Sequence, residues 1–260
     1  MKPLAEMKDA AQLRGLLFDI DDTLTSHGQL TAEAYGALER LRASGRLAIA
    51  VTGRPAGWCD HIARMWPVDA VVGENGAFYF RYFGNRLLKR YHDGDAERAA
   101  KRARLGAIAE RILAAVPGSA LASDQAYRET DLAIDYCEDV PPLPLEAAGR
   151  IAGLMREAGL TAKVSSIHVN GWFGDYDKLA MTRRLFAEAF SLAPQTQRAA
   201  LAYAGDSPND APMFDFFEHS VGVANVARFA GQLEAMPKYV TQAECGAGFA
   251  ELVRHLLGRG

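Results

Sequence analysis

The sequence is poor in cysteine and has no large excess of charge of either sign. Its 260 residues include only Cys59, Cys137 and Cys245, which lie far apart and form no C-x-x-C pair. Isolated cysteines argue against a disulfide framework and against structural zinc, and they favour a reducing compartment, so we expect a cytoplasmic protein. The formal net charge is −3 and the sequence has no basic arm, so nothing in the charge pattern indicates nucleic-acid binding.

Long apolar runs are missing as well. The first residues, MKPLAEMKDAAQLRG, mix charges with short apolar steps and contain no apolar region of a signal peptide. Nowhere do about 18 uncharged apolar residues run together, so no membrane span is expected. Hydrophobic residues nevertheless make up 49% of the chain and charged residues 23%, which is typical of a packed globular protein. We expect a monomer or a small homo-oligomer.

Short apolar runs alternate with amphipathic stretches, a pattern that predicts an α/β fold with a Rossmann-like, doubly wound parallel sheet. The predicted strands are residues 16–18, 47–51, 70–72, 200–204, 221–223 and 239–241. The predicted helices are residues 31–43, 178–190, 211–217, 226–234 and 248–257. Residues 77–83 and 86–91 flank Gly84 and Asn85, which indicates a hairpin at the edge of this sheet.

Residues 93–174 interrupt the alternation. They contain a predicted helix at 96–116, strands at 119–123 and 131–136, a helix at 145–158 and a strand pair ending at Trp172. This order favours a compact α+β insert over a continuation of the wound sheet. We therefore predict two domains, a core of residues 1–92 and 175–260 and an inserted α+β domain of residues 93–174.

Acidic residues stand where the first core strand ends, in the segment FDIDDTLT. The alternation of an extended chain places Asp19 and Asp21 on one side and Ile20 on the other. Two neighbouring carboxylates repel each other unless a cation or a shared proton lies between them, so a purely structural pair is unfavourable. Asp22 falls outside this register and is expected in a turn.

Polar residues also follow the neighbouring strands. Thr52-Gly53-Arg54 ends the second strand, and the fourth core strand ends in GDSPND, which contains Asp206 and Asp210. Ligands of an open α/β sheet bind beyond the carboxyl ends of the strands, so these segments meet at one edge. Carboxylates gathered there suggest a hard cation such as Mg²⁺. Lys178 begins a predicted helix, and by itself it is equally well a solvated surface lysine.

Four segments in this order, FDIDDTL, TGR, YDK and GDSPNDAPM, resemble the four motifs of the haloacid dehalogenase superfamily. The resemblance covers the core from Gly15 to Thr52 and from Asp177 onward. The insert lies between the second and third motifs and is preceded by GENGA at residues 73–77. This placement resembles the Cof-type subfamily (type IIB, with a C2-type cap), which includes sugar-phosphate phosphatases and phosphomannomutases.

The resemblance implies a role for each polar residue at the sheet edge. Asp19 would attack phosphorus to form an aspartyl-phosphate, and Asp21 would protonate the leaving oxygen and then activate water. Mg²⁺ would be bound by Asp19, Asp206 and the main-chain carbonyl of Asp21. Asp210 would contact these ligands and not the ion itself. The groups implied to hold the phosphate or the substrate near it are Thr52, Gly53, Arg54, Lys178 and Asn209.

The insert would close over the site as a cap that contacts the substrate. On a strand over residues 165–172, alternation places Ser166, His168, Asn170 and Trp172 on one face, and Ile167 and Val169 on the face that packs on the cap helices. If the polar face is turned toward the core, its hydrogen-bonding groups suit a sugar. The alternative is an ordinary exposed sheet face. Arg128 and Glu129 are either ligand contacts or plain turn charges. Glu74 and Asn75 resemble the ENG turn of the subfamily, although a role in starting the hairpin explains them nearly as well.

These features predict a Mg²⁺-dependent phosphatase that hydrolyses a small phosphorylated metabolite, with a sugar phosphate as the expected substrate. One alternative is a phosphomutase or phosphotransferase of the same fold, which would need an activating bisphosphate. Another is a phospho-acceptor signalling domain, which also groups acids, a threonine and a lysine around an aspartate. The length of the chain, its large insert and the late GDSPND segment argue against the signalling domain.

Overall fold

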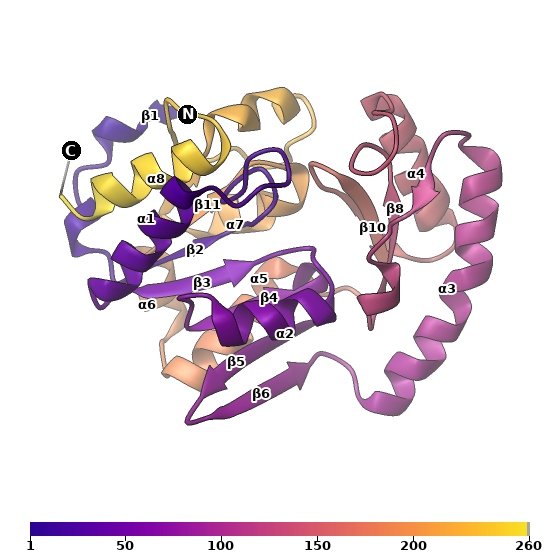
Figure 1. Ribbon diagram of the computed structural model, residues 1–260, viewed down its shortest axis with the longest axis horizontal. Coiled ribbons are helices and arrows are strands. Elements are labelled where there is room, and N and C mark those ends of the chain that lie inside the picture. Colours follow the sequence, from indigo (N-terminus) through magenta and orange to yellow (C-terminus); the bar gives the residue numbers. More distant parts are fainter. Residues whose placement is uncertain (259–260) are drawn as a thin grey trace.

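The computed structural model describes residues 1–258 and contains a nine-stranded sheet beside a four-stranded one (Figure 1). The larger sheet has the order β1-β13-β12-β11-β2-β3-β4-β5-β6; its strands run parallel as far as β4, and β5 and β6 are antiparallel. Its strands are β1 (Lys2–Pro3), β2 (Gly15–Phe18), β3 (Leu47–Val51), β4 (Ala70–Gly73), β5 (Phe78–Phe83), β6 (Arg86–Tyr91), β11 (Leu201–Gly205), β12 (His219–Gly222) and β13 (Tyr239–Val240).

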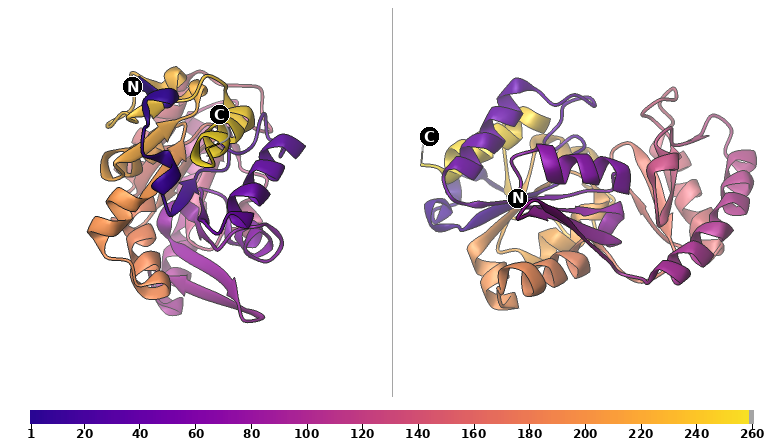
Figure 2. Two further views of the ribbon diagram at one scale, coloured as in Figure 1. Left: turned by 90° about the vertical axis from the view of Figure 1, so that its left-hand side faces the viewer. Right: turned by 60° about the horizontal axis from the view of Figure 1, so that its bottom comes forward.

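Helices cover both faces of the larger sheet (Figure 2). On one face lie α1 (Ala32–Ala43), α2 (Ala56–Met65) and α8 (Cys245–Leu256), and on the other lie α5 (Lys178–Leu185) and α7 (Ala211–Phe216). Strand side chains alternate between these two layers, so that Phe18 packs in the first and Leu17 in the second. A short helix, α6 (Pro194–Ala200), leads directly into β11. The predicted fold class is confirmed.

The four-stranded sheet belongs to the insert, which Figure 1 shows to the side of the larger sheet. Its antiparallel order is β7 (Ala120–Leu121), β8 (Asp131–Asp135), β10 (His168–Trp172) and β9 (Thr161–Val164). Helices α3 (Asp95–Ala115) and α4 (Leu145–Glu157) pack on one face of it around a separate apolar core. Its other face is turned toward the larger sheet, so the insert is positioned over the carboxyl ends of the core strands.

Most predicted elements lie within one or two residues of the observed ones, and local chemistry explains their ends. The Thr31 side chain caps α1 by accepting a hydrogen bond from the Ala34 amide at 3.2 Å. Gly84 and Asn85 have φ of 57° and 58°, which suits the tight turn of the β5–β6 hairpin. The prediction missed α2, α6 and β1. It was also wrong in the ranges 186–190 and 226–234, where a π-helical turn (Phe186–Phe190) and a 3₁₀ segment (Ala224–Phe229) replace regular α-helix.

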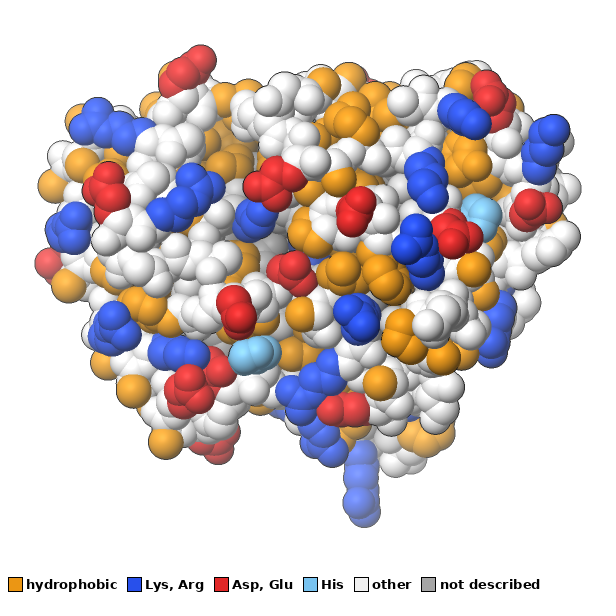
Figure 3. Space-filling model, turned by 180° about the vertical axis from the view of Figure 1, so that it is seen from behind, with side chains coloured by type: hydrophobic (Ala, Val, Ile, Leu, Met, Phe, Trp, Pro, Cys, Tyr) orange, Lys and Arg blue, Asp and Glu red, His pale blue; other side chains and the backbone are white. Residues whose placement is uncertain are grey.

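The surface matches the modest net charge of the sequence. On the face shown in Figure 3, Lys and Arg side chains are interspersed with Asp and Glu side chains. Among residues 1–258, no helix combines the length and the apolar character needed to cross a bilayer.

A strained turn, Glu74–Gly76, follows β4 and lies between the carboxyl edge of the larger sheet and the insert. Its three residues have positive φ of 43°, 54° and 108°. A Cβ atom on Gly76 would lie 2.0 Å from the carbonyl oxygen of Asp177, the residue before α5. Glycine is therefore required at this position both by the backbone conformation and by the contact.

We predict opposite effects for two glycine-to-alanine changes. Gly76→Ala should lower the free energy of unfolding by more than about 3 kcal/mol, because the new Cβ meets backbone that cannot move without displacing α5. Gly106→Ala should raise it by about 0.5–1 kcal/mol, because Gly106 lies in α3 with nothing within 4 Å of the added Cβ. Denaturant titration of both variants measures the difference, and a neutral Gly76→Ala would contradict the proposed close contact.

Candidate active site

Three buried carboxylates meet at the carboxyl edge of the larger sheet. Asp19 follows β2, Asp206 follows β11, and Asp210 lies one turn later. One oxygen of each lies within 4.8 Å of the others. The arrangement results from the topology, because β2 and β11 are parallel neighbours and the Asp19 amide donates to the Ala204 carbonyl at 2.9 Å.

Lys178 supplies a positive charge within this cluster. Its Nζ lies 2.9 Å from Asp19 Oδ1 and 2.7 Å from Asp210 Oδ1. The side chain is 1% exposed, so the interpretation of Lys178 as a solvated surface residue is wrong. Asp177 caps α5 and starts the helix so that its first residue points into the site. Burial alone would lower the pKa of Lys178, but Asp19 and Asp210 raise it above the ordinary value, so the ammonium stays charged.

One lysine does not neutralise the cluster. Burial raises the pKa of Asp19 to about 7 despite the opposing effect of Lys178, and Asp210 and Asp21 add to the rise. Burial, followed by the charges of Asp19 and Asp210, raises the pKa of Asp206 well above its ordinary value. Such carboxylates ionise together only beside a further cation. Their oxygen-only donor set fits a hard divalent cation such as Mg²⁺.

Asp210 has little capacity left for a cation. Its Oδ1 accepts from Lys178 and from the Tyr203 hydroxyl at 2.7 and 2.5 Å, and its Oδ2 accepts from the amides of Asp206 and Ser207 at 2.9 and 3.2 Å. Asp210 therefore holds Lys178 and the loop that carries Asp206. Asp206 is steadied by Thr23 and Asn225, each 3.2 Å from one of its oxygens, and neither was predicted from the sequence.

The Asp21 side chain does not join the cluster, which corrects the expected convergence of Asp19, Asp21 and Asp206. Strand β2 ends at Phe18, and Asp22 already has a φ of 53°, so alternation does not extend to residue 21. The Asp21 carboxylate instead accepts from Arg54 Nε at 3.0 Å and from Arg54 Nη2 at 2.8 Å. It lies at the interface with the insert, in the lining of a cavity shared with Glu138 and Ser166.

Thr52, Gly53 and Asn209 lie side by side next to Asn75. The Asn75 amide donates to the Thr52 carbonyl at 3.1 Å, and Asn209 Nδ2 donates to Asn75 Oδ1 at 3.0 Å. Asn75 Nδ2 is buried without a partner among the described residues and lies 3.1 Å from where a Gly53 Cβ would be. Thr52 Oγ1 accepts from the Arg54 amide at 3.0 Å. The strained turn thus orders the asparagine predicted to hold phosphate.

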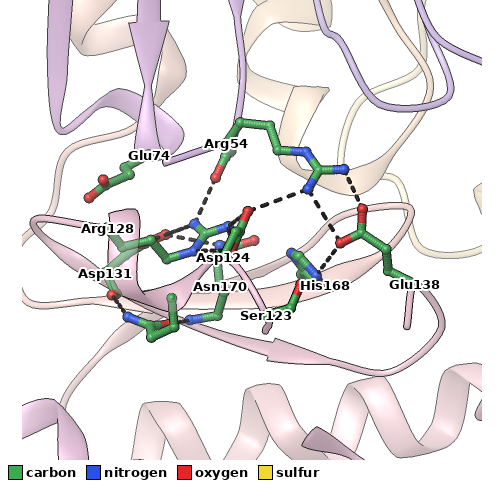
Figure 4. A network of polar contacts seen from close by, with 12 residues as sticks. Arg54, Glu74, Ser123, Asp124, Arg128, Asp131, Glu138, His168 and Asn170 are labelled. Atoms are coloured by element: carbon green, nitrogen blue, oxygen red, sulfur yellow. Dashed lines mark hydrogen bonds and ion pairs between the residues drawn. The ribbon is translucent and has the colours of Figure 1, made fainter. Parts of the chain in front are cut away.

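The polar face of β10 is turned toward the core. His168 Nε2 lies 2.9 Å from Glu138 Oε2 (Figure 4), without the geometry of a hydrogen bond. Asn170 Nδ2 donates to Asp131 at 2.9 Å and is therefore held inside the insert. Ser166 and Ile167 belong to the turn before β10 and face the core near Asp21. The prediction that Ile167 packs on the cap helices was wrong, because the strand begins only at His168 and alternation does not hold in the turn.

Arg128 links the insert to the core. Its guanidinium is fully buried, with Asp124 and Asp131 at 3.0 and 3.1 Å, and it donates to the Gly53 carbonyl at 2.8 Å. Burial alone would lower the pKa of Arg128, but Asp131 and Asp124 raise it, so it stays charged. These contacts favour a structural role for Arg128, and its role as a substrate contact stays a prediction.

Glu74 makes a second link between insert and core. Its carboxylate accepts from the Ala56 amide of the core at 2.9 Å and from the Glu129 and Thr130 amides of the insert at 2.9 and 2.7 Å. Trp172 lies in the core layer, and its Nε1 donates to the Tyr176 carbonyl at 3.1 Å. Neither residue is available to a substrate.

A cavity of about 470 Å³ opens between core and insert above Asp21. Its polar lining includes Asp21, Asp22, Arg54, Glu138 and Ser166. A larger hollow of about 700 Å³ lies outside α2 and does not include Asp21, whereas the smaller cavity is lined by Asp21, two residues after Asp19 in the chain. The smaller cavity is therefore the candidate substrate site. Glu138 was not predicted, because nothing in a loop sequence indicates which residue of an insert reaches the core.

Comparison with known proteins agrees with this geometry. The family model described as haloacid dehalogenase-like hydrolase matches residues 16–99. A sequence search among curated proteins finds no match. The fold matches a Plasmodium vivax protein described as a HAD/COF-like hydrolase, with a TM-score of 0.70 and 16% identity over 99% of this chain and 100% of that one.

Two further structures share the arrangement of core and insert. The sucrose-phosphatase of Synechocystis has a TM-score of 0.62 and 17% identity, covering 94% of this chain and 98% of that one. A subclass IIB sugar phosphatase has a TM-score of 0.59 and 14% identity, covering 93% and 98%. At such identities, these structures establish the fold alone. The family-model match over residues 16–99 agrees with the resemblance to haloacid dehalogenase-like hydrolases noted in the sequence, and the solved structures agree with it in fold.

We predict that Mg²⁺ stabilises the folded protein through Asp206. A ligand that binds only the folded state raises the free energy of unfolding by about 2.7 kcal/mol when its concentration is a hundred times its dissociation constant. This stabilisation appears as a higher melting temperature. Asp206→Asn should abolish this shift, while the metal-free variant should melt no lower than wild type because a repelling buried charge is gone. Asp215→Asn, at an exposed position of α7, should keep the shift. A full shift in Asp206→Asn would place the cation elsewhere.

Proposed function

We propose that this protein is a phosphatase that hydrolyses a small phosphorylated metabolite through an aspartyl-phosphate at Asp19. The observation that carries the proposal is the position of the Asp19 carboxylate, which is buried among Asp206, Asp210 and Lys178 at the carboxyl edge of the sheet. A carboxylate needs no deprotonation before it attacks phosphorus, unlike a hydroxyl nucleophile. The division into a core of residues 1–92 and 175–260 and a cap of residues 93–174 is part of the proposal.

Asp19 would attack in line while neighbouring donors hold the equatorial oxygens. Lys178 stays charged and keeps Asp19 Oδ1 fixed at 2.9 Å, which leaves the other oxygen to form the bond to phosphorus. Thr52, Asn209 and the Gly53 amide would hold the phosphoryl oxygens and offset the charge that builds on them. A Mg²⁺ held by Asp19, Asp206 and the Asp21 carbonyl would supply the positive charge that Lys178 alone does not provide.

Asp21 would act on the leaving group. Its carboxylate lines the cavity between core and cap, so an ester oxygen placed there can receive its proton. After the alcohol leaves, the same carboxylate would take a proton from the water that attacks the aspartyl-phosphate. Arg54 orients Asp21 through two donors, and Asp21 must give up part of this contact to reach the leaving oxygen.

The substrate class follows from the walls of the cavity. Its lining from the cap is polar, with Glu138, Ser166 and Cys137 beside Pro142 and Ile167. Groups that accept and donate hydrogen bonds suit a polyhydroxylated leaving group, which supports a sugar phosphate. The structurally similar sucrose-phosphatase was crystallised with sucrose and phosphate, and a second neighbour is described as a sugar phosphatase.

We predict that Asp19→Asn lowers phosphate release at least about a thousandfold while the protein stays folded, since losing a nucleophile removes the covalent route. Release of phosphate from a panel of sugar phosphates, measured with Mg²⁺, is the assay. Asp9→Asn, at an exposed position near the N-terminus, should behave as wild type. A folded Asp19→Asn protein with more than about a tenth of wild-type turnover would contradict the assignment of Asp19 as the nucleophile. Turnover only after addition of a sugar bisphosphate would point to a phosphomutase.

A further inference from the structure

Glu138 is an acidic side chain of the cap that reaches Arg54 of the core from a loop with a defined conformation. The loop follows β8, and the buried Asp135 carboxylate accepts from three successive amides, those of Cys137 at 2.9 Å, Glu138 at 2.8 Å and Asp139 at 2.8 Å. The Tyr136 hydroxyl ties the same loop to the Ser165 carbonyl at 2.8 Å. This scaffold presents Glu138 in a defined orientation.

The Glu138 carboxylate and Asp21 share one guanidinium. Arg54 Nη2 lies 2.5 Å from Glu138 Oε1 (Figure 4). The same nitrogen lies 2.8 Å from Asp21 Oδ1. Arg54 Nη1 also approaches Asp124 at 3.4 Å. Burial alone would raise the pKa of Glu138, but His168 and Arg54 lower it to about 2. Glu138 is therefore anionic at neutral pH.

Negative charge prevails in the part of the cavity that a leaving group would occupy. Asp21, Asp22 and Glu138 line it together with His27, and Asp22 has no ion-pair partner within residues 1–258. Burial, followed by the charge of Asp21, raises the pKa of Asp22, so Asp21 and Glu138 carry most of this negative charge. Arg54 is the one guanidinium directed inward, and its charge is already shared by Asp21 and Glu138. The other arginine of the lining, Arg228, is exposed and paired with Glu244 at 2.5 Å.

We propose that Glu138 determines specificity by charge: it admits phosphate monoesters with a neutral leaving group and rejects those whose leaving group carries a second anionic group. The proposal rests on the proposed phosphatase function and narrows its substrates to neutral sugar or polyol monophosphates, excluding bisphosphates and phosphorylated sugar acids. The carboxylate cluster and its cation act on the phosphoryl group, which is the same in both kinds of ester. The residues around the leaving group must therefore distinguish neutral esters from acidic ones.

Two aryl esters of the same shape test this charge selection without knowledge of the natural substrate. They are 4-carbamoylphenyl phosphate, which is neutral beyond its phosphate, and 4-carboxyphenyl phosphate, which carries one more negative charge. The measurement is the ratio of kcat/KM for the neutral ester to that for the acidic ester. For wild type we expect a ratio of roughly fivefold to thirtyfold, the size of one Coulomb interaction across about 7 Å of partly solvated protein.

Charge-removing and charge-keeping variants separate the proposal from a packing effect. Glu138→Gln and Glu138→Ala should both lower the ratio to about threefold or less, whereas Glu138→Asp should keep most of it because the charge remains. Glu146→Gln removes the same charge from an exposed position of α4 and should leave the ratio at the wild-type value. Melting temperatures show which variants are folded.

The outcomes are distinct. A wild-type ratio near one, or a ratio that stays high in both folded charge-removing variants, overturns the role of Glu138 while the phosphatase function stands. Failure of wild type to release phosphate from either ester, or from any sugar phosphate with Mg²⁺, overturns the proposed function itself. A lowered ratio in Glu138→Gln and Glu138→Ala together with a retained ratio in Glu138→Asp supports charge selection.

Discussion

The contact of Lys178 with Asp19 and Asp210 is the interaction on which the rest of the site depends. Parallel pairing of β2 and β11 brings buried carboxylates together, and burial of like charges is strongly unfavourable without compensation. Lys178 compensates part of this charge because Asp177 starts α5 at the sheet edge and Gly76 lets the chain pack closely there. The charge that remains explains why the cluster suits a divalent cation.

Charged groups also join the cap to the core, where an apolar interface would have been the simpler solution. Arg128 reaches from the cap to the Gly53 carbonyl, and Glu74 reaches from the core to the amides of Glu129 and Thr130. Each of these groups is fully paired, which a buried charge requires. Because both links attach next to Thr52 and Gly53, the position of the insert and the geometry of this segment depend on each other.

Much of the core and its site could be predicted from the sequence, because the relevant signals are local. The run at residues 47–51 is strand β3, and polar residues that end parallel strands necessarily meet at one edge. Side-chain direction beyond the last strand residue could not be predicted, since Asp21 lies in a turn where alternation has ended. The same reason explains the error at Ile167.

The residues that link cap and core escaped prediction for a different reason. Arg128 was visible as a turn charge, but its burial against Gly53 depends on how the two sheets dock. Glu138 gave no signal, because its position depends on the Asp135 scaffold and on Arg54, which is 84 positions away in the chain. Helix α2 was missed because it directly follows the TGR segment, which was interpreted only as a strand end.

Trapping of the covalent intermediate tests the central claim most directly. The protein is mixed with a substrate and Mg²⁺, quenched during the first turnovers and treated with borohydride, which reduces an acyl phosphate to an alcohol. The account predicts that mass spectrometry finds Asp19 converted to homoserine, in proportion to the phosphorylated fraction. Steady turnover with modification at another residue, or with no residue modified at all, would contradict it.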